Sequence, residues 1–161
     1  MNFVVNKQNS KVSVTREFAA PLAKVWAAWT QSELLDQWWA PKPWKTKTKK
    51  MEFKVGGHWL YAMLGPEGEE HWCRADFKSI SPNKSFIVSE GFCDPNGKIT
   101  TDFPIAYWHC QFSESSNKTI VQIEISYDSL ADLEKYMELG FQEGFTSALG
   151  NLDELFAASK V

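Results

Sequence analysis

"VGGHWLYAML", at residues 55–64, places two adjacent glycines before a run of large apolar side chains. Trp59, Tyr61 and Met63 occupy every second position, an alternation typical of a β-strand with the three side chains on one face. Gly56 and Gly57 supply the backbone freedom of a tight reversal, so we expect a hairpin that joins this strand to one over residues 45–55. The stretch therefore predicts a sheet with one face covered by bulky side chains.

Further strands are predicted on both sides of this hairpin. Each alternates apolar with polar residues, or forms a short apolar run next to turn signals such as "SPNK" and "DPNG". The predicted sheet is antiparallel and has about six to seven strands, because short turns connect its strands. Besides the opening stretch, the strands cover residues 11–18, 45–55, 71–80, 85–93, 104–112 and 119–127.

Two short helices are expected after the first strand. The first has Pro21 at its first helical position, and the second is capped by Ser32. Apolar side chains mark one face of the first helix and recur through the second. These are Leu22, Val25, Trp26 and Trp29 in the first helix, and Leu34, Leu35, Trp38 and Trp39 in the second.

The end of the chain is predicted to form one long helix. Ser129 and Asp132 make a capping box, and the helix runs from there to about residue 158, a length of about 45 Å. Gly140 and Gly144 lie beside its apolar stripe. The stripe consists of Leu130, Leu133, Met137, Phe141, Phe145, Ala148, Leu152 and Leu155. A curved antiparallel sheet can hold such a helix in its concave face, so the predicted fold class is α+β.

Length, charge and cysteine usage limit the class of protein. The 161 residues suit a single domain with one core, and a net charge of -3 argues against nucleic-acid binding. Cys73, Cys93 and Cys110 show no C-x-x-C spacing, so we expect free thiols in a reducing compartment. Neither a signal peptide nor a membrane-spanning run occurs in the sequence. A cytoplasmic protein that does not act at a membrane is therefore expected.

Five motifs carry a resemblance to a known family: "TREFAAPLAKVWAAWT", "ELLDQWWAP", "FKVGGHWLYAM", "ISPNKSF" and "GFQEGFTSALGNLDEL". They extend over roughly residues 11–157 and resemble the START-like, polyketide-cyclase-like superfamily. Within it they are most similar to homologues of the activator of the ninety-kilodalton heat-shock protein ATPase. The resemblance implies the helix-grip fold, with an elongated pocket between the C-terminal helix and the sheet. It does not imply one activity, because members include lipid and hormone carriers, cyclases and domains that touch a chaperone.

Three features depart from the family pattern. Ala75 stands where a glycine is expected and Phe145 where a tryptophan is common, which predicts a pocket of different shape. The eukaryotic co-chaperone also carries an additional N-terminal domain without a counterpart in this sequence. That difference weakens the case for chaperone activation.

The resemblance implies a pocket with apolar walls and few polar groups, which would suit a hydrophobic small molecule. A filled core is the alternative, because aromatic stripes usually serve packing. Gly140 and Gly144 favour the open pocket, since they remove helix side chains that would fill it. The expected lining residues are Arg16, Trp59, Tyr61, Met63, His71, Cys73, Phe77, Glu90, Trp108, Phe112, Met137, Phe141 and Phe145.

The polar residues in this set are candidates for chemistry. Arg16 shares a strand face with apolar residues, and a buried guanidinium requires a partner. Glu90 is the plausible partner if its strand turns that face inward, which the sequence leaves open. The pair is either a structural ion pair or a ligand anchor with a shifted pKa. His71 is either a general base or an inert histidine, so the catalytic candidates are His71, Glu90 and Tyr61.

Metal and nucleic-acid sites receive little support. His71 and Cys73 could supply two metal ligands from one strand, but no recognised ligand spacing completes them. We therefore expect neither a metal nor another cofactor. The run "KPWKTKTKK", at residues 42–50, contains five lysines and is better explained as a solvated sheet edge than as a nucleic-acid surface. A patch for a protein partner is the other interpretation.

Three functions remain open from the sequence. The leading hypothesis is a noncatalytic or weakly catalytic domain that binds a hydrophobic small molecule. The second is a co-chaperone-like interaction domain that stimulates a chaperone ATPase. The third is a cyclase- or dehydratase-type enzyme that uses pocket acid-base residues. The sequence is compatible with a monomer and with a homodimer.

Overall fold

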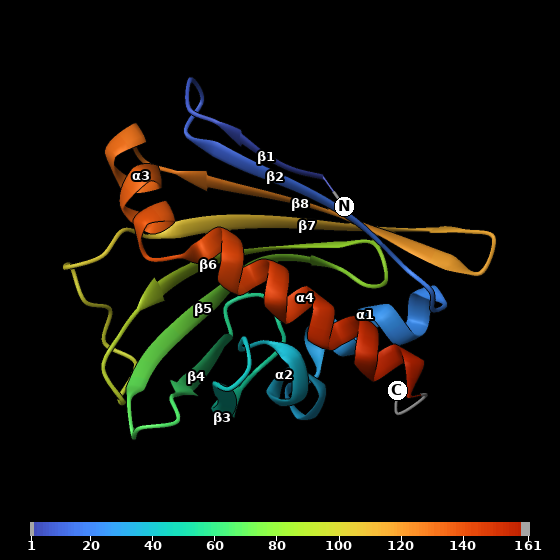
Figure 1. Cartoon of the computed structure of the whole chain (residues 1–161), viewed down its shortest axis with the longest axis horizontal. Coiled ribbons are helices and arrows are strands. Elements are labelled where there is room, and N and C mark those ends of the chain that lie inside the picture. Colours follow the sequence, from blue (N-terminus) through green and yellow to red (C-terminus); the bar gives the residue numbers. More distant parts are fainter. Residues whose placement is uncertain (1, 159–161) are drawn as a thin grey trace.

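One antiparallel sheet with helices on its concave face makes up the protein (Figure 1). The computed structural model describes residues 2–158, which form eight strands and four helices. The strands are β1 (Asn2–Asn6), β2 (Lys11–Phe18), β3 (Lys45–Met51), β4 (His58–Leu64), β5 (Glu70–Ser81), β6 (Ser85–Phe92), β7 (Ala106–Ser115) and β8 (Lys118–Tyr127). The helices are α1 (Leu22–Thr30), α2 (Ser32–Trp38), α3 (Leu130–Glu138) and α4 (Phe141–Ala157). The sheet order is β1-β2-β8-β7-β6-β5-β4-β3.

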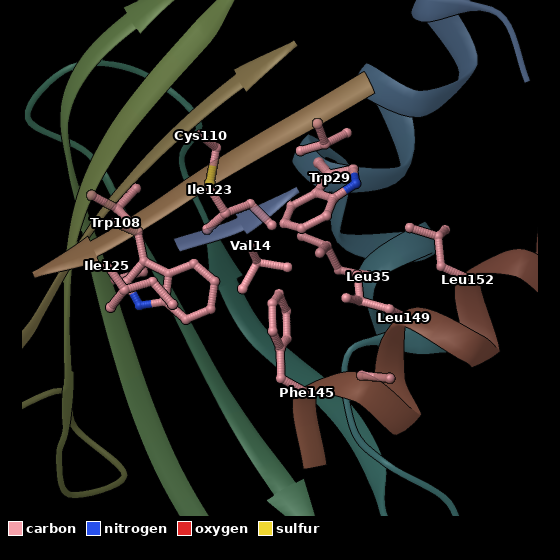
Figure 2. Close-up of a cluster of buried hydrophobic side chains, with 14 of the residues drawn as sticks. Val14, Trp29, Leu35, Trp108, Cys110, Ile123, Ile125, Phe145, Leu149 and Leu152 are labelled. Atoms are coloured by element: carbon pink, nitrogen blue, oxygen red, sulfur yellow. The ribbon is translucent and has the colours of Figure 1, made fainter. Parts of the chain in front are cut away.

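The core lies between the inner face of the sheet and the helices (Figure 2). Alternate strand residues point into it, as Val12 and Val14 of β2 do, while Ser13 between them is exposed. Trp29 of α1, Leu35 of α2 and Leu152 of α4 cover this face from the other side. The amphipathic patterns of the strands and helices therefore meet in one hydrophobic core.

The predicted helix-grip fold is confirmed, and the sheet has one strand more than expected. The additional strand, β1, pairs with β2 at the edge of the sheet. Its only apolar residues are Phe3, Val4 and Val5, too short a pattern to predict a strand. Phe3 packs against Phe141 with ring centroids 6.3 Å apart, whereas Val4 on the other face is 56% exposed.

The long C-terminal helix predicted from Ser129 to about residue 158 is in fact two helices. The Ser129 hydroxyl does cap α3, since it accepts a hydrogen bond from the Asp132 amide at 3.1 Å. The chain then breaks at Gly140, which has a φ of 84°. This left-handed backbone favours glycine and cannot continue an α-helix. Gly140 therefore redirects the chain between α3 and α4.

Two predicted helix starts shift by one residue. Pro21 precedes α1 in an extended conformation, so the helix begins at Leu22. Ser32 is the first residue of α2, and Gln31 occupies the N-cap position. Neither helix has a side-chain cap, so their position depends on packing of their apolar faces.

The glycine pair of the opening stretch lies in a wider connection than the predicted tight hairpin. β3 ends at Met51 rather than at residue 55, and residues 52–57 lead into β4. Gly56 has a φ of 87° and its amide donates to the Phe77 carbonyl at 3.0 Å. A Cβ on Gly57 would lie 2.2 Å from the Glu52 carbonyl oxygen, so only glycine fits there. Both glycines are required by backbone geometry.

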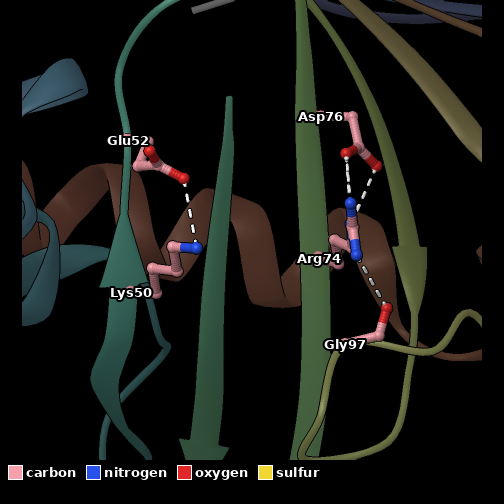
Figure 3. A network of polar contacts seen from close by, with 5 residues as sticks. All are labelled: Lys50, Glu52, Arg74, Asp76 and Gly97. Carbon is pink, nitrogen blue, oxygen red and sulfur yellow. Dashed lines mark hydrogen bonds and ion pairs between the residues drawn. The ribbon is translucent and has the colours of Figure 1, made fainter. Parts of the chain in front are cut away.

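The outer face of the sheet carries polar contacts near β3 and β5 (Figure 3). Arg74 of β5 donates to Asp76 on the same strand and to the Gly97 carbonyl at 3.1 Å. Lys50 and Glu52 form an ion pair at 3.2 Å. The lysine-rich β3 forms an edge of the sheet, as expected for a solvated edge. No helix within residues 2–158 is long and apolar enough to cross a membrane.

Candidate functional site

A cavity of about 190 Å³ lies between the α3–α4 segment and the inner face of the sheet. Its walls are mainly aromatic and aliphatic, and within residues 2–158 Glu90 is the only carboxyl group among its lining residues. The lining consists of Trp39, Pro41, Tyr61, Met63, Cys73, Glu90, Phe92, Trp108, Tyr136, Leu139, Phe141, Gly144 and Phe145. A single carboxyl group in an apolar cavity is the central feature of this site.

Small residues lie beside Glu90 and at the cavity wall. Ala75 of β5 and Ala106 of β7 lie directly beside Glu90 on the two neighbouring strands. Gly144 lines the cavity from α4, and a Cβ there would contact only Pro41, at 3.8 Å. Larger residues at positions 75 and 106 would crowd the carboxyl group, and a larger residue at position 144 would narrow the cavity. The cavity is therefore built into the residue pattern of the sheet and the helix.

The structure settles which face of β6 is buried. Phe86, Val88 and Glu90 point inward, and Glu90 is only 7% exposed. Inward placement of Glu90 is the arrangement that the sequence left open. The alternation of β6 alone could not decide it, because both of its faces carry apolar residues.

The predicted pairing of Arg16 with Glu90 is wrong. Arg16 of β2 instead forms a hydrogen-bonded ion pair with Asp153 of α4. β8 and β7 separate β2 from β6, a lateral distance of roughly 14 Å at about 4.8 Å per strand. Arg16 also lies opposite Val121, near the far end of β8 from the strand residues beside Glu90. The pair with Asp153 links β2 to α4 and lies outside the cavity.

A short hydrogen-bond chain ends on Glu90. The Tyr61 hydroxyl donates to the Glu90 Oε1 atom, and the Trp39 Nε1–H donates to the Tyr61 oxygen at 3.0 Å. Tyr61 lies on β4 and Glu90 on β6, so the phenol reaches across β5. Cys73 and Ala75, the β5 residues paired with Tyr61 and Glu90, are small enough to permit this crossing.

Burial controls the protonation of the site. Removal from water raises the pKa of Glu90 to about 7, although the hydrogen bond from Tyr61 acts in the opposite direction. Burial also raises the pKa of Tyr61 and of Cys73 well above their usual ranges, and the charge of Glu90 adds to both shifts. Near neutral pH the phenol and the thiol are therefore uncharged, and Glu90 is the group that titrates.

Aromatic rings in contact with one another form much of the cavity wall. Trp108 contacts Phe145 edge-on at 5.3 Å between ring centroids, and Trp39 lies 5.7 Å from Trp108. Phe141 and Phe145 of α4 stack on each other at 5.4 Å. Trp108 and Phe145 point into the same space from the sheet and from α4 (Figure 2). The Trp108 Nε1–H is buried without a hydrogen-bond partner among residues 2–158.

Several of the lining residues predicted from the sequence lie around the cavity. Tyr61, Met63, Cys73, Glu90, Trp108, Phe141 and Phe145 all line the cavity. Trp59 and Phe77 line a smaller cavity of about 30 Å³ deeper in the core. Trp39, Glu90 and Trp108 contribute to both cavities and separate them.

Other predicted lining residues lie elsewhere. Phe112 packs against Trp26 of α1, with ring centroids 5.1 Å apart, in the filled part of the core. Met137 faces β1 beside Val5 and Leu133, because the break at Gly140 rotates α3 relative to α4. The predictions for Phe112 and Met137 assumed that the cavity extends along the whole sheet under one continuous helix.

His71 is exposed and does not line the cavity. It lies opposite Met63 near the end of β5, and its ring packs on Trp44 at 5.2 Å. The proposed acid-base group of His71, Glu90 and Tyr61 therefore does not converge, and only Glu90 and Tyr61 meet. Among residues 2–158 there is no group of three or more His, Cys, Asp or Glu side chains suited to a metal ion.

Sequence reasoning missed several lining residues: Trp39, Pro41, Phe92, Tyr136 and Leu139. The double tryptophan before "APKP" could have indicated Trp39, since its neighbour Trp38 already fills the apolar face of α2. Tyr136 lines the cavity in the place predicted for Met137, because the helix breaks at Gly140.

The fold and the cavity can now be compared with known proteins. The family profile described as "Activator of Hsp90 ATPase homolog 1-like protein" matches residues 19–157. The chain belongs to this family.

Several solved structures share the fold of this Hsp90-activator-like chain. Protein Ms6760 from Mycobacterium smegmatis is 25% identical, with a TM-score of 0.89 over 96% of this chain and 95% of that one. A protein from Arthrobacter aurescens is 25% identical, with a TM-score of 0.92 over 98% and 91% of the two chains. The AHSA1 protein from Silicibacter pomeroyi is 20% identical, with a TM-score of 0.71 over 92% and 99%. No curated protein matches the sequence.

Proposed function

We propose that this protein binds a small, largely apolar molecule in the cavity between the α3–α4 segment and the sheet. The observation that carries the proposal is the cavity itself, with aromatic walls around one buried carboxyl group. Binding sites for small molecules commonly combine apolar walls with a few fixed polar groups. Glu90 and Tyr61 are the polar pair that would orient the ligand.

The volume of the cavity limits the size of the ligand. At about 190 Å³ it is smaller than the roughly 300–1,000 Å³ of pockets for drug-sized molecules. It is larger than an engineered apolar cavity of about 150 Å³ that binds benzene. A ligand with one ring, or a short branched chain, is therefore the expected size.

Tryptophan fluorescence provides a direct test, because Trp39 and Trp108 line the cavity. Titration with benzyl alcohol should change the emission in a saturable way and raise the thermal midpoint of unfolding. A wild-type protein that shows neither response to a panel of single-ring compounds would overturn the proposal.

Two glycines of α4 provide a matched pair of variants. Gly144 lines the cavity, whereas a Cβ at Gly150 would have no neighbour within 4 Å. Gly144→Leu should place apolar atoms at the cavity wall and weaken binding by about tenfold or more. Gly150→Leu should bind as the wild type does. Equal binding by both variants would place the ligand outside this cavity.

Membership of the Hsp90-activator-like family supports a second candidate, stimulation of a chaperone ATPase. This candidate rests on the family description and not on a feature of the cavity. ATPase turnover of a chaperone of this class, measured with and without the protein, tests it. An unchanged rate at saturating protein would count against it.

A further inference from the structure

Glu90 has no positively charged neighbour within the described residues 2–158. Its titratable neighbours from the strands and from α3 are phenols and thiols, and α4 contributes only apolar residues and a glycine to the cavity. The titratable neighbours are Tyr61 of β4, Cys73 of β5, Cys110 of β7, Tyr127 of β8 and Tyr136 of α3. Burial raises the pKa of each of these groups, so all five stay neutral near pH 7. The ionised Glu90 would thus be an isolated negative charge.

An isolated buried carboxylate is an incomplete arrangement. Buried charges in proteins are normally paired with an opposite charge, because removal from water is costly. The Tyr61 hydroxyl donates a hydrogen bond to one carboxyl oxygen of Glu90. No other hydrogen bond from residues 2–158 shifts the pKa of Glu90. The cavity begins at this carboxyl group, so a ligand can supply the missing positive charge.

The walls of the cavity fit a cation as well. Trp39, Trp108, Tyr136, Phe141 and Phe145 supply five aromatic rings around the space. The electron-rich face of an aromatic ring attracts a cation, and tryptophan does so most strongly. Aromatic side chains combined with a carboxylate form the chemistry by which proteins recognise ammonium groups.

We propose that the ligand is a compact organic cation, in which an ammonium group pairs with Glu90 and an apolar ring or branched chain fills the space against Trp39, Trp108 and Phe145. This inference rests on the proposed function, since it specifies the ligand class of the same cavity. A fatty acid or another organic anion would place its charge against the ionised Glu90 and should bind weakly.

Benzylamine and benzyl alcohol separate the two proposals, because they differ chiefly in the charged group. At about pH 8 the amine is protonated and Glu90 is mostly ionised. Benzylamine should bind the wild-type protein at least about tenfold more tightly than benzyl alcohol, and benzoate should bind most weakly. Glu90→Gln should remove the preference for the amine while benzyl alcohol still binds.

The pH dependence of benzylamine binding is measured on the wild-type protein, so this test does not depend on how Glu90→Gln folds. Between about pH 8 and about pH 6 the amine stays charged while Glu90 takes up a proton, so benzylamine should bind the wild type more weakly at the lower pH. Benzyl alcohol, which carries no charge, should lack this loss. Equal affinity for amine and alcohol at about pH 8, or a pH-independent amine affinity, would overturn the organic-cation inference and leave the proposed function standing. Failure of all three compounds to bind would overturn the proposed function.

Discussion

The space between sheet and helices has two halves that differ in packing. In the half covered by α1, α2 and the C-terminal part of α4, side chains such as Val14, Trp29 and Leu152 fill the interior except for a cavity of about 30 Å³ (Figure 2). In the half under α3 and the first turn of α4, a cavity remains around Glu90. Both halves are built from the same alternating strands and amphipathic helices.

The difference arises from a few small residues and one polar residue. Ala75 and Ala106 flank Glu90 and Gly144 lines the same cavity, whereas Leu149 and Leu152 occupy the next turns of α4. A buried carboxyl group destabilises the folded protein when it is ionised. The open half thus combines lower packing density with an electrostatic cost, which is typical of binding sites rather than of structural cores.

Leucine truncations in the two halves should differ most. Leu152 is fully buried in the packed half, so Leu152→Ala should lower the free energy of unfolding by about 4 kcal/mol. Leu139 lines the cavity and is 49% exposed, so Leu139→Ala should cost less than about 1 kcal/mol. Chemical denaturation of both variants measures the contrast. Similar losses would mean that the two halves do not differ in packing.

Glu90 should make stability depend on pH. Its pKa is raised from 4.5 to about 7 in the folded protein, so the folded state binds the proton more tightly than the unfolded state. The free energy of unfolding should therefore be greatest below about pH 4.5 as far as Glu90 contributes. It should fall by about 3 kcal/mol as the pH rises through about 7.

Denaturation of the wild type and of two variants across this pH range isolates the contribution of Glu90 to stability. Glu90→Gln should lack this fall, and Glu138→Gln, at an exposed position, should retain it. A Glu90→Gln profile parallel to that of the wild type would show that the carboxyl group is not buried as described.

Glycine-to-alanine substitutions at Gly140 and Gly150 should change the free energy of unfolding in opposite directions. Gly140 has a φ of 84° at the start of α4, above the open half, so Gly140→Ala should destabilise the protein by about 1 kcal/mol. Gly150 lies within α4 with no neighbour near its Cβ position. Gly150→Ala should stabilise the protein by up to about 1 kcal/mol. Thermal unfolding of the two variants distinguishes a redirected chain at Gly140 from a continuous helix.

The sequence predicted most of the fold because its patterns are local. Alternation over β2, β5, β7 and β8 and the capping box at Ser129 fixed these elements within a few residues. β1 and the helix break were missed, because a three-residue apolar run and a single glycine carry little signal. Contacts between residues far apart in the sequence could not be predicted either.

The candidate site shows the same limit. Tyr61 and Trp108 were predicted from strand faces and do line the cavity, whereas the sequence left the facing of Glu90 open. The partner of Arg16 depends on which strands separate β2 from β6, and the exposure of His71 depends on where the cavity ends along β5. Neither can be read from the pattern of one strand.

A chemical-shift titration of isotopically labelled protein with benzyl alcohol tests the central claim most directly. The account predicts saturable shifts of the backbone amides of Phe92, Leu139 and Phe145, which line the cavity, and little change at Val14 and Leu152 in the packed half. No saturable shift at any of these amides, or shifts confined to residues outside the cavity, would contradict it.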